Sequence, residues 1–132
     1  MKTVLLGLLA LATPAVAQAP NWAKGTPIYM TMTNHGFTPR RIQLRSNVVY
    51  TLHVANRSDQ GHNLTARGFF GGAARVAPRD RGRVAHDRLS LEAGQRATVH
   101  FMLPSMPPSR YEFRSTALAD AANDYRGGFY VN

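Results

Sequence analysis

The sequence contains no cysteine at all. This absence excludes disulfide bonds, a thiolate metal ligand, a redox-active dithiol and a cysteine nucleophile. A domain without disulfides depends on its hydrophobic core for stability, and 132 residues are enough for one such core. The sequence therefore predicts a single domain that is held together by apolar packing.

Lysine is almost as scarce, because Lys2 and Lys24 are the only two and arginine supplies the rest of the 16 basic residues. Acidic residues number 7, so the formal net charge is +9. A basic surface attracts acidic proteins, anionic lipids and nucleic acids. Net charge does not identify a specific function, and an arginine-rich surface that serves solubility is the simplest interpretation.

The sequence also lacks an apolar run long enough to span a bilayer. The longest one, residues 4–12, follows the positive charge of Lys2 and precedes the small residues Ala15-Val16-Ala17. This order is typical of a secretory signal peptide, and the run is too short for a transmembrane helix. We therefore expect a periplasmic or secreted protein with no membrane span after cleavage. Its expected parts are a signal peptide (1–17), an N-terminal arm (18–27) and one domain (28–132).

Common catalytic motifs are missing as well. The sequence has no Gly-x-Ser-x-Gly elbow, no His-Glu-x-x-His helix and no glycine-rich phosphate loop. We therefore predict that the protein is not an enzyme. Export argues against nucleic acid, so no nucleic acid is expected, and the expected partner is an unknown periplasmic protein or an anionic molecule.

What the sequence does contain is a series of short segments in which apolar and polar residues alternate. Met30 and Met32 belong to the first of these segments, and their regular alternation indicates core side chains and not metal ligands. Short strands at such intervals, without a long helical segment, predict an all-β fold, a β-sandwich of about 7–8 strands. Residues 67–88 form a variable excursion, in which a short helix is expected near Gly71 and a charged loop over Arg79–Arg88. The expected strands are 28–33, 41–45, 48–55, 62–65, 89–91, 97–103, 111–116 and 129–131.

Two motifs near the ends of strands indicate which kind of β-sandwich this is. Tyr111-x-Phe113-x-Ser115 is followed by a ten-residue loop and by Gly127-Gly128, and Gly61-His62-Asn63 stands upstream between a loop and a strand. Together they resemble the cupredoxins of the plastocyanin and pseudoazurin type. The resemblance runs from about residue 28 to 131 and implies a Greek-key cupredoxin-like β-sandwich.

The resemblance also implies where copper ligands would stand. Cupredoxins of this type use one histidine before the long loop, and then Cys, His and Met in the last loop. By this comparison His62 is retained, whereas Ser115, Asp120 and Tyr125 occupy the positions of the Cys, the second His and the Met. A serine hydroxyl stays protonated near neutral pH, and a phenol is not a thioether. The expected protein therefore has no type 1 copper and acts as a binding or structural module instead of an electron carrier.

A different metal site stays open as an alternative. By resemblance, His35 belongs to a loop beside the metal end, so His35, His62 and Asp120 would form a copper(II) or zinc site if they converge. Equally open is the view that His62 is a residual histidine, that His35 is a polar loop residue and that no cofactor is bound. Ser115 lies near His62 and Asp120 in this scheme. The three residue types of a catalytic triad are therefore present, but nothing else in the sequence indicates hydrolase activity.

The other three histidines are less suitable as metal ligands, and the arginine-rich loop suggests a different binding function. His53 and His100 alternate with apolar residues, so solvent exposure is expected for both, and positive charge around His86 opposes a cation. The segment Arg79–Arg88 offers a second alternative function, an anion-binding module.

Overall fold

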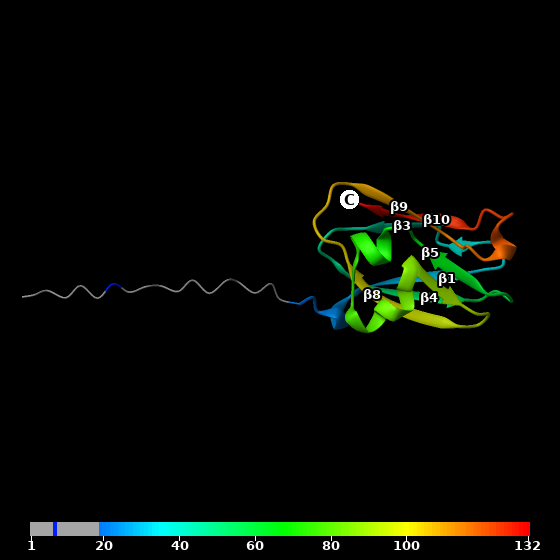
Figure 1. Ribbon diagram of the computed structural model, residues 1–132, viewed down its shortest axis with the longest axis horizontal. Coiled ribbons are helices and arrows are strands. Elements are labelled where there is room, and N and C mark those ends of the chain that lie inside the picture. Colours follow the sequence, from blue (N-terminus) through cyan, green and yellow to red (C-terminus); the bar gives the residue numbers. More distant parts are fainter. Residues whose placement is uncertain (1–6, 8–18) are drawn as a thin grey trace, which may run out of the picture.

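The computed structural model describes Gly7 and residues 19–132; the predicted signal peptide, residues 1–17, lies outside the described residues apart from Gly7. Strands dominate the described chain, and they form two five-stranded sheets packed face to face (Figure 1). The predicted all-β sandwich is confirmed. Within the described residues, no helix is both long enough and apolar enough to cross a membrane.

The first sheet has the strand order β2-β1-β4-β8-β6. Its central strand β4 pairs in parallel with β1 and antiparallel with β8. Because β2 and β6 have only two residues each, the longer strands carry most of this sheet. The bounds of its strands are β1 Thr26–Met32, β2 Phe37–Thr38, β4 Val49–Asn56, β6 Arg75–Val76 and β8 Arg96–Met102.

The second sheet has the order β3-β10-β9-β5-β7 and contains the terminal strand pair that the sequence predicted. β9 and β10 pair antiparallel over six residue pairs, and β3 joins β10 in parallel. The bounds are β3 Arg41–Leu44, β5 His62–Thr65, β7 Arg88–Leu91, β9 Ser109–Arg114 and β10 Arg126–Val131. β10 begins three residues earlier than expected. Gly127 permits this, since a Cβ there would lie 2.2 Å from the Arg40 carbonyl oxygen and 2.5 Å from the Phe113 ring.

The core lies between the sheets and includes a cluster of contacting aromatic rings. Phe129 from β10 stacks on Phe69 at 4.3 Å between ring centroids and contacts Phe113 at 4.9 Å. Met30 and Met32 are 1% and 0% exposed, so the prediction that they are core residues is confirmed. Aromatic contacts of this kind add to the hydrophobic stabilisation of the sandwich.

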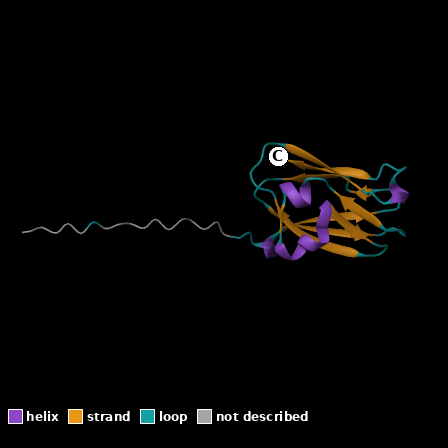
Figure 2. Ribbon diagram, in the orientation of Figure 1, coloured by secondary structure: helices purple, strands orange, loops and turns teal. Residues whose placement is uncertain are grey.

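The excursion at residues 67–88 is more ordered than the sequence suggested (Figure 2). A helical turn, η2 Phe69–Ala73, begins two residues before the expected helix at Gly71, because Phe69 and Phe70 are buried in the core. The expected charged loop over Arg79–Arg88 is instead largely a 3-10 segment, η3 Pro78–Asp87.

Two further expectations require correction. Asp80 of η3 is buried, accepts a bond from the His100 backbone N–H at 2.9 Å and lies 2.8 Å from its Nδ1, so His100 is covered and not solvent-exposed. His53 is half-buried, because the exposed ring of Tyr29 stacks on it at 5.0 Å. The arm before the first strand contains a helical turn, η1 Trp22–Lys24.

Candidate functional site

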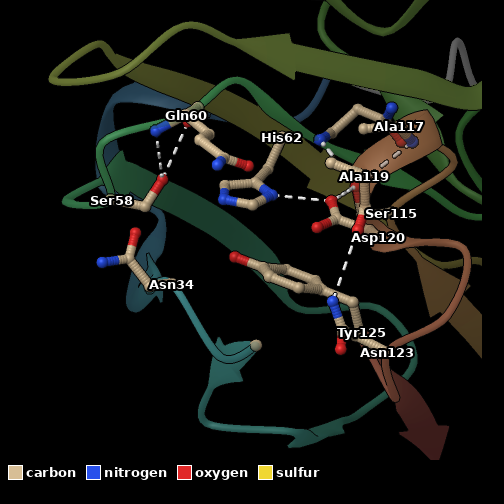
Figure 3. A network of polar contacts seen from close by, with 12 residues as sticks. Asn34, Ser58, Gln60, His62, Ser115, Ala117, Ala119, Asp120, Asn123 and Tyr125 are labelled. Atoms are coloured by element: carbon tan, nitrogen blue, oxygen red, sulfur yellow. Dashed lines mark hydrogen bonds and ion pairs between the residues drawn. The ribbon is translucent and has the colours of Figure 1, made fainter.

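Four side chains from separate segments meet at one end of the sandwich (Figure 3). His62 is the first residue of β5, and Ser115 directly follows β9. Asp120 ends the short 3-10 helix η4, Leu118–Asp120, and Tyr125 directly precedes β10. All four are buried, with exposed fractions of 2–7%. The structure therefore brings together His62 and the three positions that the sequence analysis matched to lost copper ligands.

The carboxylate of Asp120 is the centre of this cluster. Its Oδ2 lies 2.6 Å from His62 Nδ1 and accepts the hydroxyl hydrogen of Ser115 at 2.5 Å. An ionised carboxylate only accepts hydrogen bonds, so this contact places the proton of the imidazole on Nδ1. The other ring nitrogen, His62 Nε2, is buried and has no hydrogen-bond partner among the described residues.

Tyr125 covers the imidazole and links the cluster to the first sheet. Its ring stacks on the His62 ring at 4.5 Å with an interplanar angle of 20°. Its hydroxyl donates to the Thr33 carbonyl oxygen at 2.6 Å, in the turn that follows β1. Burial raises the pKa of the Tyr125 hydroxyl well above its usual value, the negative charge of Asp120 adds to this shift, and Arg40 opposes it.

Asn63 holds β5 against the loop that carries Ser115. Its Oδ1 accepts hydrogen bonds from the Thr116 backbone N–H at 2.9 Å and from the Thr65 hydroxyl at 2.7 Å, while its own backbone N–H donates to Ser115 Oγ at 3.3 Å. In the sequence, Asn63 belongs to the Gly61-His62-Asn63 motif, which does not reveal this role. Its only sequence signal is its position beside His62.

The donor set does not fit a type 1 copper site. Such a site requires a thiolate, and the position expected for it holds a hydroxyl that is hydrogen-bonded to Asp120. The Nδ1 of His62 is bonded to the same carboxylate, and the Tyr125 hydroxyl is bonded to a backbone carbonyl. The side chains at the four positions are therefore bonded to one another or to the backbone.

The alternative metal site that includes His35 is not assembled. His35 is exposed in the turn after β1, whereas His62 and Asp120 are buried. Over residue 7 and residues 19–132, no three His, Cys, Asp or Glu side chains are placed to hold a metal ion. The structure thus pairs two of the three predicted ligands and leaves the third outside the pair.

The same distances distinguish this cluster from a hydrolytic triad. In a Ser-His-Asp triad the imidazole lies between the hydroxyl and the carboxylate, so that it accepts the hydroxyl proton. Here the carboxylate of Asp120 lies between Ser115 and His62, and the hydroxyl donates to that carboxylate instead of to an imidazole nitrogen. Ser115 is not positioned as an activated nucleophile.

Two arginine side chains of η3 contact strand β8 of the first sheet. Arg83 donates to the Thr98 carbonyl oxygen at 3.0 Å, and the Arg79 guanidinium lies 3.4 Å from His100 Nε2. Asp87 accepts hydrogen bonds from two backbone N–H groups, of Gly68 and Gly71. These contacts give η3 a role in covering the first sheet.

Comparison with known proteins agrees with this architecture. No family model matches the chain, and no curated protein matches it either. Among solved structures, it resembles a dithionite-reduced auracyanin from the photosynthetic bacterium Roseiflexus castenholzii, with 17% identity, a TM-score of 0.58 and coverage of 82% of this chain and 98% of the other. Auracyanin B is also 17% identical, with a TM-score of 0.55 over 89% of this chain and 93% of the other.

A multi-copper oxidase from Pediococcus acidilactici extends the same comparison. It is 12% identical with a TM-score of 0.59, and 80% of this chain corresponds to 25% of the oxidase. At these identities the likeness establishes the fold. The chain is a cupredoxin-like β-sandwich, as the sequence motifs predicted.

Tyr125 provides a test of the site through the pH dependence of stability. Its pKa is raised in the folded protein, so above pH 10 the unfolded chain releases this proton first and stability falls as pH rises. We expect Tyr125→Phe to lower the unfolding free energy by about 1 kcal/mol at pH 8, through loss of the bond to Thr33. Between pH 10 and 11 this deficit should shrink by about 1 kcal/mol, as measured by urea unfolding, because the phenol of the unfolded chain is half ionised at pH 10 and mostly ionised at pH 11.

Tyr29→Phe is the matched control, because Tyr29 is 71% exposed. It should show the same alkaline loss of stability as the unmodified protein. A Tyr125→Phe variant with an unchanged pH dependence would contradict the burial of the Tyr125 phenol in this cluster.

Proposed function

We propose that this chain is a cupredoxin-like binding module that does not transfer electrons through a type 1 copper and does not act as an enzyme. The observation that carries the proposal is the double hydrogen bond of Asp120, whose Oδ2 contacts both His62 and Ser115. The side chains that would have to coordinate a metal are hydrogen-bonded to one another instead. On the signal-peptide pattern we place the module in the periplasm or outside the cell.

In this proposal the buried cluster is a structural clamp. Asp120, Ser115 and His62 join β5 to the loop between β9 and β10, and Tyr125 joins that loop to the turn at Thr33. Hydrogen-bonded buried polar groups rigidify the segments that contain them. A rigid scaffold of this kind suits a module that presents a surface to a partner.

A second candidate function, the holding of copper(II) or zinc, has one observation in its favour. The Nε2 of His62 is buried without a hydrogen-bond partner, and an imidazole whose Nδ1–H meets a carboxylate is a good metal ligand through Nε2. For this function the exposed His35 would have to move beside Nε2, and Asp120 would have to leave the Nδ1 side of the ring to reach the same ion.

Metal titration separates the two candidates. For the metal-free module, copper(II) gives no intense visible charge-transfer band, since no thiolate exists, and equimolar copper or zinc leaves the melting temperature unchanged. For a metal holder, an ion at 100 times its Kd stabilises the fold by about 2.7 kcal/mol. That stabilisation would weaken as pH falls through about 6.5, where model histidines gain a proton.

Variants make the same experiment specific to the site. A melting-temperature increase that His62→Gln and His35→Ala each remove, and that His53→Ala retains, would overturn the metal-free module. Weak binding that declines slightly with every histidine replaced, measured by calorimetry, agrees with scattered surface histidines and supports it.

A further inference from the structure

The outer face of the second sheet is covered by arginine side chains. Its strands carry five exposed arginines and one acidic residue, Glu112. Neither lysine of the chain belongs to these strands. In Figure 1, strands β3, β9 and β10 of this sheet form the upper layer of the sandwich. The arginines are Arg41 on β3, Arg88 on β7, Arg110 and Arg114 on β9, and Arg126 on β10.

A shallow hollow lies on this face, over Gly128 of β10 and next to the edge strand β3. Because Gly128 has no side chain, the neighbouring side chains surround an open volume of about 520 Å³. A Cβ at this position would approach the Tyr130 ring at 3.1 Å and Arg110 Nε at 3.4 Å. The side chains that line the hollow are Arg40, Arg41, Arg110, Asp124, Arg126 and Tyr130.

Two of these arginines are held in place without an acidic partner. The Arg41 guanidinium stacks over the Tyr130 ring at 3.7 Å, and that of Arg110 lies 5.5 Å from the same ring. Within the described part of the chain, neither forms an ion pair with a carboxylate. Stacking orders the planar guanidinium, so less entropy is lost when it forms two hydrogen bonds to an anion.

The positive charge continues from this hollow across the sheet. Arg126 is directly opposite Arg114 in the β10–β9 register, and Arg114 is opposite Thr65 of β5. Arg114 and Arg67 line a second hollow on this side. Ion pairs with Glu112 and Asp124 neutralise part of the charge, but both carboxylates are solvent-exposed, and such pairs exchange partners at little cost.

We propose that this surface, which we call the arginine face, binds the acidic surface of a protein partner, with Arg41, Arg110 and Tyr130 at the centre of the contact. Three properties favour a protein as the occupant. Tyrosine and arginine are enriched at protein interfaces, lysine is depleted there, and the guanidinium fork matches a carboxylate. This inference goes beyond the proposed function and does not depend on the state of the buried cluster, because other residues carry it.

Binding of poly-L-glutamate at about 0.1 M salt, measured by calorimetry on the full chain, tests the proposal. The double substitution Arg41→Gln/Arg110→Gln should weaken binding at least about tenfold, since it removes two guanidinium groups that donate charge-assisted hydrogen bonds to carboxylates. The matched control is Arg81→Gln/Arg83→Gln in η3, which removes the same charge from the other arginine-rich segment and should weaken binding less than about twofold.

The outcomes that would overturn the proposal are distinct. Equal losses in both double variants would mean that only net charge matters, and a larger loss in the η3 variant would assign the anion site to Arg79–Arg88. A preference for heparin oligosaccharides or phosphatidylglycerol vesicles over polyglutamate would assign the face to a polysaccharide or a membrane. Arg41→Lys/Arg110→Lys keeps the charge but not the fork, so full binding by this variant would also contradict the role of guanidinium geometry. Thermal melting of each variant excludes unfolding as the cause.

Discussion

Asp120→Ala is expected to lower the free energy of unfolding by about 3–5 kcal/mol, because each of the two buried donors that lose their acceptor costs about 1–3 kcal/mol. The substitution leaves the Nδ1–H of His62 and the hydroxyl of Ser115 buried without an acceptor. For a domain of this size the melting temperature should fall by roughly 15 °C or more. Calorimetry or urea unfolding measures both quantities.

Two controls show whether the effect comes from the buried cluster. Asp120→Asn keeps an acceptor oxygen and the side-chain shape, so it should cost only about 1–2 kcal/mol. Asp124→Ala removes an exposed carboxylate from the same loop, where it pairs with Arg40 and Arg126, and its effect should be small. If Asp120→Ala were no more destabilising than Asp124→Ala, Asp120 would not be the centre of a structural clamp.

Replacing the three non-ligand residues should create a blue copper site. We expect the triple variant Ser115→Cys, Asp120→His and Tyr125→Met to give an intense visible charge-transfer band with copper(II), where the unmodified protein gives none. The positions already meet at His62, and removal of the Asp120 carboxylate frees the Nδ1 of that histidine. Absorption spectroscopy and metal analysis provide the measurement.

The control for this gain of function is His62→Gln in the triple variant, which should abolish the colour. Since loss of Asp120 destabilises the apoprotein, its folding is first checked by circular dichroism at low temperature, and bound copper should then raise the melting temperature. A folded triple variant that binds copper without colour would show that the geometry of the 115–125 loop differs from that of a cupredoxin copper site.

Much of the fold was predictable because a strand with one buried face alternates in sequence with a period of two. Tyr111, Phe113 and Ser115 face inward while Glu112 and Arg114 are exposed, as their alternation predicted. The same argument correctly assigned Met30 and Met32 to the core. The excursion at 67–88 has no such period, and its helical segments depend on Phe69 reaching Phe129 and on Asp80 reaching His100.

The candidate site was predictable only in part. The motif spacing located His62, Ser115, Asp120 and Tyr125, and the lack of cysteine excluded a thiolate at any of them. Sequence reasoning left open whether His62 and Asp120 bind an ion or each other, because they are 58 positions apart and their relative placement depends on two loops. Whether His35 joins them was also left open by the sequence, and in the structure His35 is exposed.

The sequence by itself determined which functional groups the protein has and which class of fold it adopts. It has no thiolate and an excess of arginine, and its strands follow the order of a cupredoxin. Only the tertiary structure decided which side chains meet. It joined Asp120 to His62 and Ser115, covered His100 with η3, and gathered arginines from separate strands beside Tyr130. The physical reason is that patterns along the chain report which face of a segment is buried. The partner of a polar side chain depends instead on how segments distant in sequence pack against each other.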